Sequence, residues 1–353
     1  MRRRTFLTGA GAAAAGSAAA DAAPRSSEPA STAGLPPRKV IVGTAMQSFW
    51  VEHPGLEKRL HQLAGIVDAM AHDARSTYGR SLDLAILPEV AITGEAGGDA
   101  LACSVPFEGA VANTFGRLAR EHSCYIVVPT YLLESRERKL CTNAAVLVGR
   151  KGEVVGIYRK VHLVPSPDGK SMEAGSTAGS DFPVFSCDFG KLGIQICYDM
   201  EFDRGWNDLA VKGAELIAWP TQSPQTAQPA FRALQQRCYI VSSTWRNNAS
   251  VFEPTGKIAA QIRPPEQALV HELDLSYAIL PWSGKLKNGK ALAEKFGDRI
   301  GFRYYEDEDC GIFWSNDPQT PVRQMVRSLG LREAPEQLAR VREFYRKAGV
   351  LDY

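Results

Sequence analysis

The sequence lacks the marks of a metalloprotein and of a nucleic-acid-binding protein. Its six histidines are scattered without ligand spacing, and no two cysteines are separated by two residues. Protein zinc sites need such closely spaced ligands. The 41 lysines and arginines nearly balance the 39 aspartates and glutamates, which leaves a formal charge of +2. We therefore expect no metal centre and no nucleic-acid partner, since nucleic acid requires a basic surface.

The sequence also lacks an apolar run that could serve as a membrane anchor, which requires about 20 residues. The nearest candidate is the Ala- and Gly-rich stretch 9–20, which follows the basic start RRTFL at residues 3–7. Small residues at Ala20-Asp21-Ala22 then offer a cleavage site. This order is typical of an export signal, and the paired arginines indicate the twin-arginine route. We predict a twin-arginine signal over residues 1–22, a linker over 23–37, and a periplasmic or secreted protein without a membrane anchor.

Nothing in the sequence indicates a disulfide framework. The seven cysteines are odd in number and show no paired spacing. Loss of residues 1–22 would remove three arginines and one aspartate and bring the formal charge to about 0. The remaining chain is long enough for one large domain with a sizeable core, which does not depend on disulfides. A leftover cysteine in an exported protein raises the question of a reactive thiol.

The apolar pattern alternates between strand and helix from Lys39 onward. Leu56, Leu60, Leu63 and Val67, for example, recur at helical spacing. We expect strands at residues 40–43, 82–87, 125–128, 144–148, 154–158, 182–189, 192–196, 216–219 and 239–244, two more ending near residue 274, and helices at 55–76, 110–121, 204–212 and 230–237. Helices interleaved with hairpins predict a layered α/β or α+β sheet domain.

Three polar residues, Glu89, Lys160 and Cys197, stand at the ends of expected strands. Side chains at the ends of core strands can converge at one sheet edge, which is where open α/β sheets place ligands. Taken singly, each residue has a simpler explanation. A cysteine with apolar neighbours is usually an inert core residue, and a Glu or Lys at a strand end is usually solvated. Only their combination indicates a catalytic site.

The three residues lie in stretches that resemble the nitrilase (carbon–nitrogen hydrolase) superfamily. These stretches are ILPE at 86–89, YRKVHL at 158–163 and GIQICYD at 193–199, and their order and spacing hold from about residue 39 to 274. The resemblance implies a four-layer αββα sandwich and a catalytic triad of Glu89, Lys160 and Cys197. It also implies hydrolysis of a non-peptide C–N bond without a metal or organic cofactor. Subunits are expected to associate through a helical face into a homodimer or higher homo-oligomer.

The chemistry explains why such residue types are needed. The thiolate is the nucleophile, and a free thiol has a pKa of about 8.5, so the attacking cysteine needs a base. The resemblance implies that Glu89 takes this proton, and that Lys160 and the backbone N–H of Tyr198 stabilise the oxyanion. Superfamily members commonly carry a second Glu between the Lys and the Cys, oriented towards the substrate. Glu173 fits this position best, although a solvated loop carboxylate is the simpler explanation for it.

Two departures from the superfamily pattern leave the substrate open. The stretch FDR at 202–204 stands where Phe-Pro-Glu is frequent, and Tyr198-Asp199 replaces the Trp-Glu that usually follows the Cys in the nitrile-cleaving branch. We predict an amidase or N-carbamoyl amidohydrolase that cleaves its small-molecule amide or N-carbamoyl substrate through a Cys197 thioester. The alternatives are a nitrilase acting on a nitrile, and a non-catalytic binding or assembly protein that keeps the fold.

The catalytic domain is expected over residues 38–275, which leaves 276–353 as a C-terminal extension. This extension is short for a stable core of its own, yet it is rich in large aromatic side chains. Leu338, Val341 and Tyr345 fit one face of a final helix. We predict that the extension completes the pocket or the oligomer interface, and that it is not an independent domain.

Overall fold

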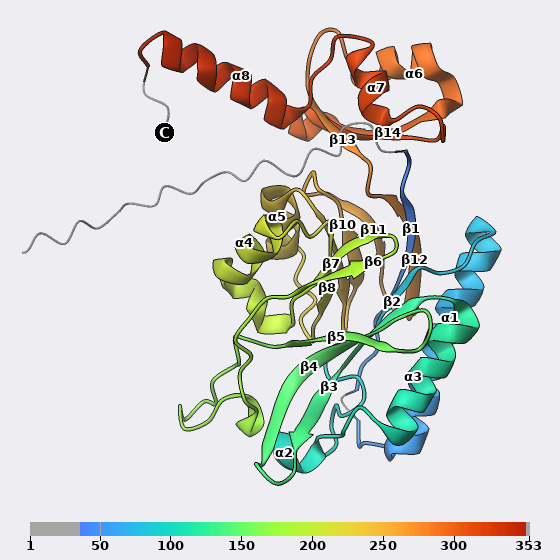
Figure 1. Cartoon of the computed structure of the whole chain (residues 1–353), viewed down its shortest axis with the longest axis vertical. Helices are drawn as coiled ribbons and strands as arrows, with labels where there is room; N and C mark the ends of the chain where they lie inside the picture. Colours follow the sequence, from blue (N-terminus) through green and yellow to red (C-terminus); the bar gives the residue numbers. More distant parts are fainter. Residues whose placement is uncertain (1–35, 50, 351–353) are drawn as a thin grey trace, which may run out of the picture.

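The computed structural model of the chain describes residues 36–49 and 51–350, so the predicted export signal lies outside the described residues. Two six-stranded sheets pack face to face, and a smaller sheet of three strands stands at one end of this sandwich (Figure 1). Within the described ranges, no helix is long and apolar enough to cross a membrane.

The first sheet has the order β12-β1-β2-β3-β4-β5. Its strands are β1 (Lys39–Ala45), β2 (Leu84–Ile86), β3 (Tyr125–Ser135), β4 (Leu140–Val148), β5 (Val154–Arg159) and β12 (Ala268–Asp274). Strands β1, β2 and β3 are parallel, whereas β4 is antiparallel to both β3 and β5. Strand β5 therefore runs in the same direction as β2, and the carboxyl ends of these two strands lie at the same sheet edge.

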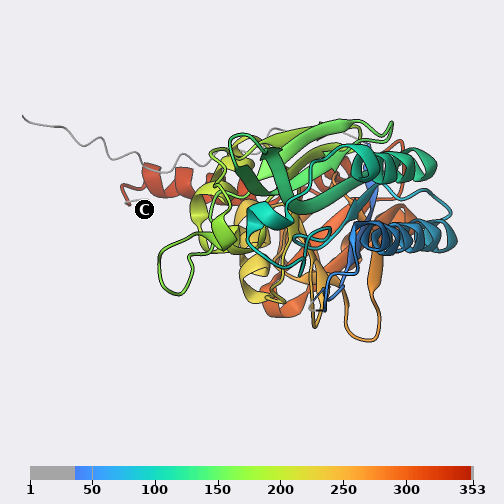
Figure 2. The same ribbon diagram turned by 90° about the horizontal axis from the view of Figure 1, so that it is seen from below.

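Helices cover the outer face of this first sheet. They are α1 (Leu56–Tyr78) and α3 (Gly109–His122), with the short α2 (Ala100–Cys103) near one end of β3 and β4. Figure 2 shows α1 and α3 side by side on one flank of the sandwich. Helix α1 ends at Gly79, whose positive φ of 65° closes the last turn, as is common at helix C-termini.

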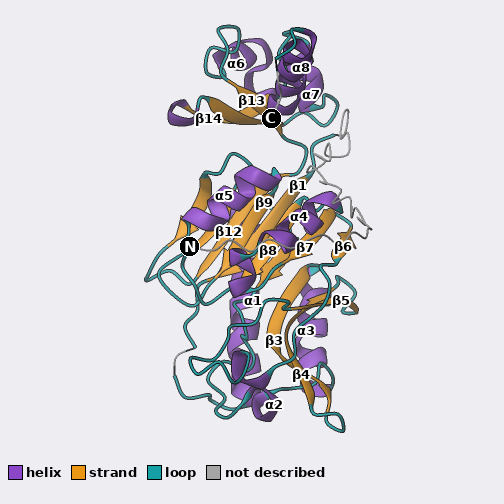
Figure 3. Ribbon diagram, turned by 90° about the vertical axis from the view of Figure 1, so that its left-hand side faces the viewer, coloured by secondary structure: helices purple, strands orange, loops and turns teal. Residues whose placement is uncertain are grey.

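The second sheet has the order β11-β10-β9-β8-β7-β6. Its strands are β6 (Val184–Cys187), β7 (Gly190–Ile194), β8 (Leu216–Pro220), β9 (Tyr239–Ser243), β10 (Ala249–Phe252) and β11 (Ile258–Ile262). Strands β7, β8 and β9 are parallel. Helices α4 (Asp203–Val211) and α5 (Ala227–Gln236) cover the outer face of this sheet (Figure 3).

The central strands of the two sheets, such as β1, β8 and β9, are apolar on both faces because both faces are buried. Along β1, Val40 and Val42 pack between the two sheets, whereas Ile41 between them faces the core under α1 and α3. Alternate side chains of a strand point to opposite faces, so such a strand appears in the sequence as a continuous apolar run. The layers are helix, sheet, sheet and helix, and the predicted four-layer αββα sandwich is confirmed.

The two sheets are also joined by hydrogen bonds at one edge. The Ser243 hydroxyl at the end of β9 lies 3.0 Å from the carbonyl oxygen of Ala45 and 2.9 Å from that of Ile86. Next to it, the backbone N–H of Thr244 donates to Ala45 (2.9 Å), and the N–H of Gln47 donates to Thr244 (2.9 Å). This polar seam connects the second sheet directly to β1 and β2.

The C-terminal residues form a small unit of their own. Its elements are β13 (Ala278–Pro281), α6 (Lys290–Phe296), β14 (Ile300–Tyr305), β15 (Cys310–Ser315), α7 (Val322–Arg327) and α8 (Ala334–Lys347), with short 3-10 turns at Gly297–Arg299 and Glu306–Glu308. The unit has a separate apolar cluster that includes Leu280, Leu292 and Phe313. It is tied to the sandwich by Arg303, which lies 2.6 Å from the fully buried carboxylate of Glu253. Figure 1 shows α8 projecting away from the rest of the unit.

Most expected elements of the sandwich are present within a few residues of the expected bounds. The sequence prediction missed the long extension of β3 and β4 beyond Val128, strand β10, and the three-stranded C-terminal sheet. Strand β10 is only four residues long, and the hairpin extension contains charged residues that break the apolar pattern. The helix expected from Leu338, Val341 and Tyr345 is present as α8.

Candidate active site

Glu89 lies where the chain leaves the carboxyl end of β2, and its side chain is only 1% exposed. The indole N–H of Trp245 donates to its backbone carbonyl at 2.9 Å and fixes the main chain there. Its Oε1 atom accepts hydrogen bonds from Lys160 Nζ (2.8 Å) and Asn143 Nδ2 (2.9 Å). Its Oε2 atom is buried and has no partner among the described residues. One carboxylate oxygen is thus held firmly, and the other is left for a reacting group.

Lys160 follows β5 and is also 1% exposed. Its Nζ donates to Oε1 of Glu89 and to Oε1 of Glu173, at 2.8 and 2.9 Å. Burial disfavours the charged amine, but these two carboxylates and Cys197 outweigh it and raise the pKa of Lys160 well above its ordinary value. The backbone at Gly179 packs directly against the end of β5. A Cβ at residue 179 would lie 2.2 Å from the Arg159 carbonyl oxygen, so this close approach requires a glycine. The raised pKa favours the charged form of Lys160, so the site contains a buried cation.

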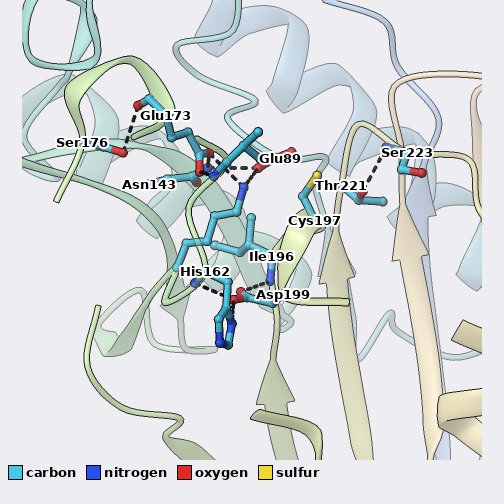
Figure 4. A network of polar contacts seen from close by, with 12 residues as sticks. Glu89, Asn143, His162, Glu173, Ser176, Ile196, Cys197, Asp199, Thr221 and Ser223 are labelled. Carbon is cyan, nitrogen blue, oxygen red and sulfur yellow. Dashed lines mark hydrogen bonds and ion pairs between the residues drawn. The ribbon is translucent and has the colours of Figure 1, made fainter. Parts of the chain in front are cut away.

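Cys197 follows β7 and opens the 3-10 turn Cys197–Glu201 with a φ of 44°. A non-glycine residue rarely adopts this left-handed conformation, which marks a sharp and strained turn. The indole N–H of Trp219 holds the Cys197 carbonyl at 3.1 Å. Figure 4 shows the thiol side chain between Glu89 on one side and Thr221 on the other. Burial, and next the negative charge of Glu89, raise the pKa of the Cys197 thiol to about 12.

Glu173 reaches the same cluster from the loop between β5 and β6. Residues Glu173, Ala174 and Gly175 all have positive φ, so this 3-10 turn (Glu173–Gly175) is tightly coiled in the left-handed region. The carboxylate accepts from Lys160 Nζ and Asn143 Nδ2. Burial raises the pKa of Glu173 despite the opposing charge of Lys160, and the nearby Glu89 raises it further. The carboxylate expected as the fourth member of the site is therefore largely enclosed by it, with a side chain that is 10% exposed.

Asp199 connects the segment that carries the lysine to the segment that carries the cysteine. It is fully buried, and its Oδ2 accepts from the Tyr158 hydroxyl (2.7 Å) and the Ile196 N–H (3.0 Å). Its Oδ1 accepts from His162. Tyr158 and His162 flank Lys160 in the sequence, and Ile196 precedes Cys197, so one carboxylate sets the distance between the two segments.

Tyr198 directly follows Cys197 in the 3-10 turn, and its half-buried ring packs edge-on against Phe202 with 5.4 Å between centroids. The structure thus brings all of the predicted residues into one locality: Glu89, Lys160, Glu173, Cys197 and Tyr198. Sequence reasoning missed Asn143, which contacts both glutamates, and gave no role to Asp199. The available signal for Asn143 was an isolated amide in the otherwise apolar run TNAAVLV at 142–148.

The layered fold brings the Glu, Lys and Cys side chains together, and comparison with known proteins confirms the predicted superfamily membership. The sequence model of the carbon–nitrogen hydrolase family matches residues 53–280, so the chain belongs to this family. Membership of this family supports hydrolysis of a carbon–nitrogen bond. Among the described residues, no group of three or more His, Cys, Asp or Glu side chains could hold a metal ion.

Similar proteins include the probable nitrilase C965.09 of Schizosaccharomyces pombe, which is 30% identical over 216 residues covering 56% of this chain and 78% of that protein. The deaminated glutathione amidase of Homo sapiens is 28% identical over 206 residues, which cover 51% of this chain and 62% of that protein. The chain thus spans less than two thirds of the human protein's length. The crystal structure of Saccharomyces cerevisiae Nit3, a member of branch 10 of the nitrilase superfamily, superposes with a TM-score of 0.56. That superposition covers 67% of this chain and 90% of Nit3 at 20% identity, and the likeness concerns the fold.

Proposed function

We propose that this protein hydrolyses a small amide or N-carbamoyl compound through a thioester on Cys197. One observation carries the proposal. The thiol lies beside a buried carboxylate, Glu89, whose Oε1 is held by Lys160 while its Oε2 has no partner among the described residues. A nucleophile, a base with a free oxygen and a fixed cation are the groups that acyl transfer requires.

The first step begins from a neutral thiol. Because the pKa of Cys197 is raised to about 12, the thiolate is scarce at neutral pH. The proton must therefore leave as sulfur attacks the carbonyl carbon, and Oε2 of Glu89 is the atom available to accept it. The new S–C bond converts the carbonyl oxygen into an oxyanion. Lys160 and the backbone N–H of Tyr198 stabilise this charge.

The second step breaks the C–N bond. Glu89 returns the proton to the departing nitrogen, which leaves as ammonia or an amine, and the acyl group stays on Cys197 as a thioester. A water molecule then attacks the thioester carbon while Glu89 takes one of its protons. The acid is released, and the proton returns to the sulfur of Cys197. Glu173, which shares Lys160 with Glu89, faces the same region and orients the substrate.

The choice of an amide rests on the Tyr198-Asp199 sequence after the nucleophile and on the human relative, which is an amidase by name. The S. pombe relative is named a probable nitrilase, so a nitrile is the competing substrate. The test uses matched amide, N-carbamoyl and nitrile compounds with the same side chain. Detection of the free acid from the amide or carbamoyl compound, with an acyl adduct mass on Cys197, supports the proposal. Turnover of the nitrile alone assigns a nitrilase. A protein without any adduct or turnover is a non-catalytic member of the fold.

The proposed location and assembly follow from other features. We propose that residues 1–22 direct export through the twin-arginine route, and that no membrane anchor remains. We also propose a homodimer or higher homo-oligomer, because the neighbouring helices α4 and α5 leave Val211 and Phe231 exposed by 67% and 56%. The residues 38–275 and 276–353 are proposed as catalytic domain and extension. Cell fractionation and sedimentation of the purified protein test location and assembly separately.

A further inference from the structure

Asn143 contacts both carboxylates of the site through one atom. It lies in β4, directly opposite Tyr131 of β3, and its side chain is fully buried. Its Nδ2 donates to Oε1 of Glu89 at 2.9 Å and also to Oε1 of Glu173. An amide nitrogen carries two hydrogens, so each hydrogen serves one carboxylate.

Lys160 contacts the same two oxygen atoms from another direction. Its Nζ lies 2.8 Å from Oε1 of Glu89 and 2.9 Å from Oε1 of Glu173. The four groups thus form a closed ring in which donors and acceptors alternate. Because both donors use Oε1 of Glu89, its Oε2 remains without a partner among the described residues. Figure 4 shows Glu89 between Asn143 and Cys197.

We propose that Asn143 is a positioning residue of the reaction, which anchors Oε1 of Glu89 so that Oε2 stays available to the Cys197 thiol, and which keeps Lys160 between the two glutamates. This inference rests on the proposed function of the site. Without Asn143, the Glu89 carboxylate can rotate and offer both of its oxygens to Lys160. Lys160 would then move off the position from which it faces the oxyanion.

An asparagine suits this position because it donates two hydrogen bonds without adding charge. An Asp would bring a third negative group to a buried site that already holds two carboxylates. Besides the two glutamates, the titratable groups in or next to this ring are Lys160 from the end of β5, Cys197 from the turn after β7, and Tyr131 from β3. Hydrogen bonds to a carboxylate favour its charged form, so loss of the one from Asn143 makes Glu173, whose pKa is already raised by burial, easier to protonate.

The test compares Asn143→Leu, which is similar in size but has no donor, with wild type and with Thr142→Val. Thr142 is the neighbouring buried residue of β4, and its hydroxyl donates to Glu134, away from the ring. We expect Asn143→Leu to lower kcat on the order of tenfold to a hundredfold with little change in KM, because small displacements of reacting groups have effects of this size. Thr142→Val should retain wild-type kcat.

The pH–rate profile separates positioning from packing. We expect the acid limb of kcat to move up by about one pH unit in Asn143→Leu, since a hydrogen bond to a charged group is worth about that much. In the isosteric Asn143→Asp variant the acid limb of kcat should move to still higher pH, because a third negative charge is added to the site. A mere loss of packing would move neither limb. If Asn143→Leu does not fold, the pH–rate profile of Asn143→Asp tests the positioning role in its place.

The alkylation rate of Cys197 by iodoacetamide, followed by peptide mass spectrometry, gives a readout that needs no substrate. We expect both Asn143 variants to alkylate more slowly than wild type at neutral pH, because Oε2 of Glu89 is less available as the base. If wild type turns over no amide but the variants still alkylate slowly, the proposed function fails and the positioning role stands. Unchanged alkylation together with an unmoved acid limb in folded variants overturns the positioning role.

Discussion

His162 donates both its backbone N–H and its ring Nδ1–H to one oxygen of Asp199, at 3.0 and 2.8 Å. The same imidazole stacks on the ring of Phe202, with 4.0 Å between centroids and an interplanar angle of 7°. The ring of His162 therefore has a hydrogen-bond partner at Nδ1 and a stacking partner on one face. The arrangement assigns it to the support of Asp199, and leaves Glu89 as the base beside the thiol.

Replacing Asp199 by Asn should impair catalysis and stability together. Asp199 accepts from four donors: the Tyr158 hydroxyl, the Ile196 N–H, and the backbone and ring N–H groups of His162. The Asn side chain of the variant cannot accept from all four, and a buried donor left without a partner costs about 1–3 kcal/mol. We expect an unfolding free energy lower by about 2–4 kcal/mol and a kcat reduced by at least an order of magnitude. Urea denaturation and steady-state kinetics measure the two effects. Tyr158→Phe removes only one of the donors, so a loss as large as that of Asp199→Asn would contradict this account.

The triad should behave as a unit. Cys197→Ala, Glu89→Gln and Lys160→Ala should each remove nearly all turnover, because groups that act together are strongly non-additive. Their stabilities should differ. Lys160→Ala leaves the carboxylates of Glu89 and Glu173 without a counter-ion and should cost about 3–5 kcal/mol, whereas Cys197→Ala should leave the melting temperature almost unchanged. Substantial residual turnover in Cys197→Ala would exclude it as the nucleophile.

Mild acid should destabilise the protein through His271. This residue of β12 has a buried Nε2 without a partner in the described part of the chain. Burial, and next the positive charge of Arg303, lower the pKa of His271 from 6.5 to about 4. Its folded pKa lies below its unfolded pKa, so its stabilising contribution is present above pH 6.5 and is lost as the pH falls towards 4. We expect a loss of about 2 kcal/mol between pH 7 and pH 5.

Calorimetry at the two pH values measures this loss in the wild-type protein and in two variants. His271→Gln should flatten the pH dependence because it removes the titrating group. His61→Gln changes an exposed His of α1 and should leave the dependence as it is. Equal pH dependence in all three proteins would rule out His271 as its source.

Helix α8 should contribute to assembly and little to the stability of one subunit. None of its residues is buried, and its apolar stripe leaves Leu338 and Tyr345 exposed by 49% and 45%. We expect truncation after Glu333 to lower the sedimenting mass while the melting temperature of the subunit changes little. Leu338→Asp should act in the same direction, and Arg340→Glu on the opposite side should not. An unaltered mass after truncation would show that α8 lies outside the interface.

Much of the sandwich could be predicted from sequence because its strands are buried on both faces and its helices are amphipathic. Glu89 and Lys160 could be placed at one edge of the first sheet because they follow β2 and β5, which run in the same direction. The hairpin of β3 and β4 lies between these two strands. Asn143 could not be found in this way. It lies within β4 and not at its end, and its role depends on two carboxylates that arrive from residues 54 positions before and 30 positions after it.

The C-terminal sheet escaped prediction for a different reason. Its strands β13 and β15 are short, and Pro281, Gly301 and Gly311 interrupt the patterns that mark a strand. One contact that joins it to the sandwich is an ion pair between Arg303 and the buried Glu253, which are 50 positions apart. Charges at such distances show no periodicity, so only three-dimensional contacts reveal that they meet.

The seam at Ser243 has a consequence for how this protein responds to heat and pressure. The thiol belongs to the second sheet and its base to the first, so the distance between them is also a measure of how the two layers are aligned. Ser243 fixes that alignment at the carbonyl of Ile86, three residues before Glu89. A slip of the layers by a fraction of an ångström would leave every strand intact and still separate the sulfur from the oxygen that must take its proton. Inactivation can thus precede any change in secondary structure, and the rate of turnover is a sensitive measure of how the two sheets are aligned.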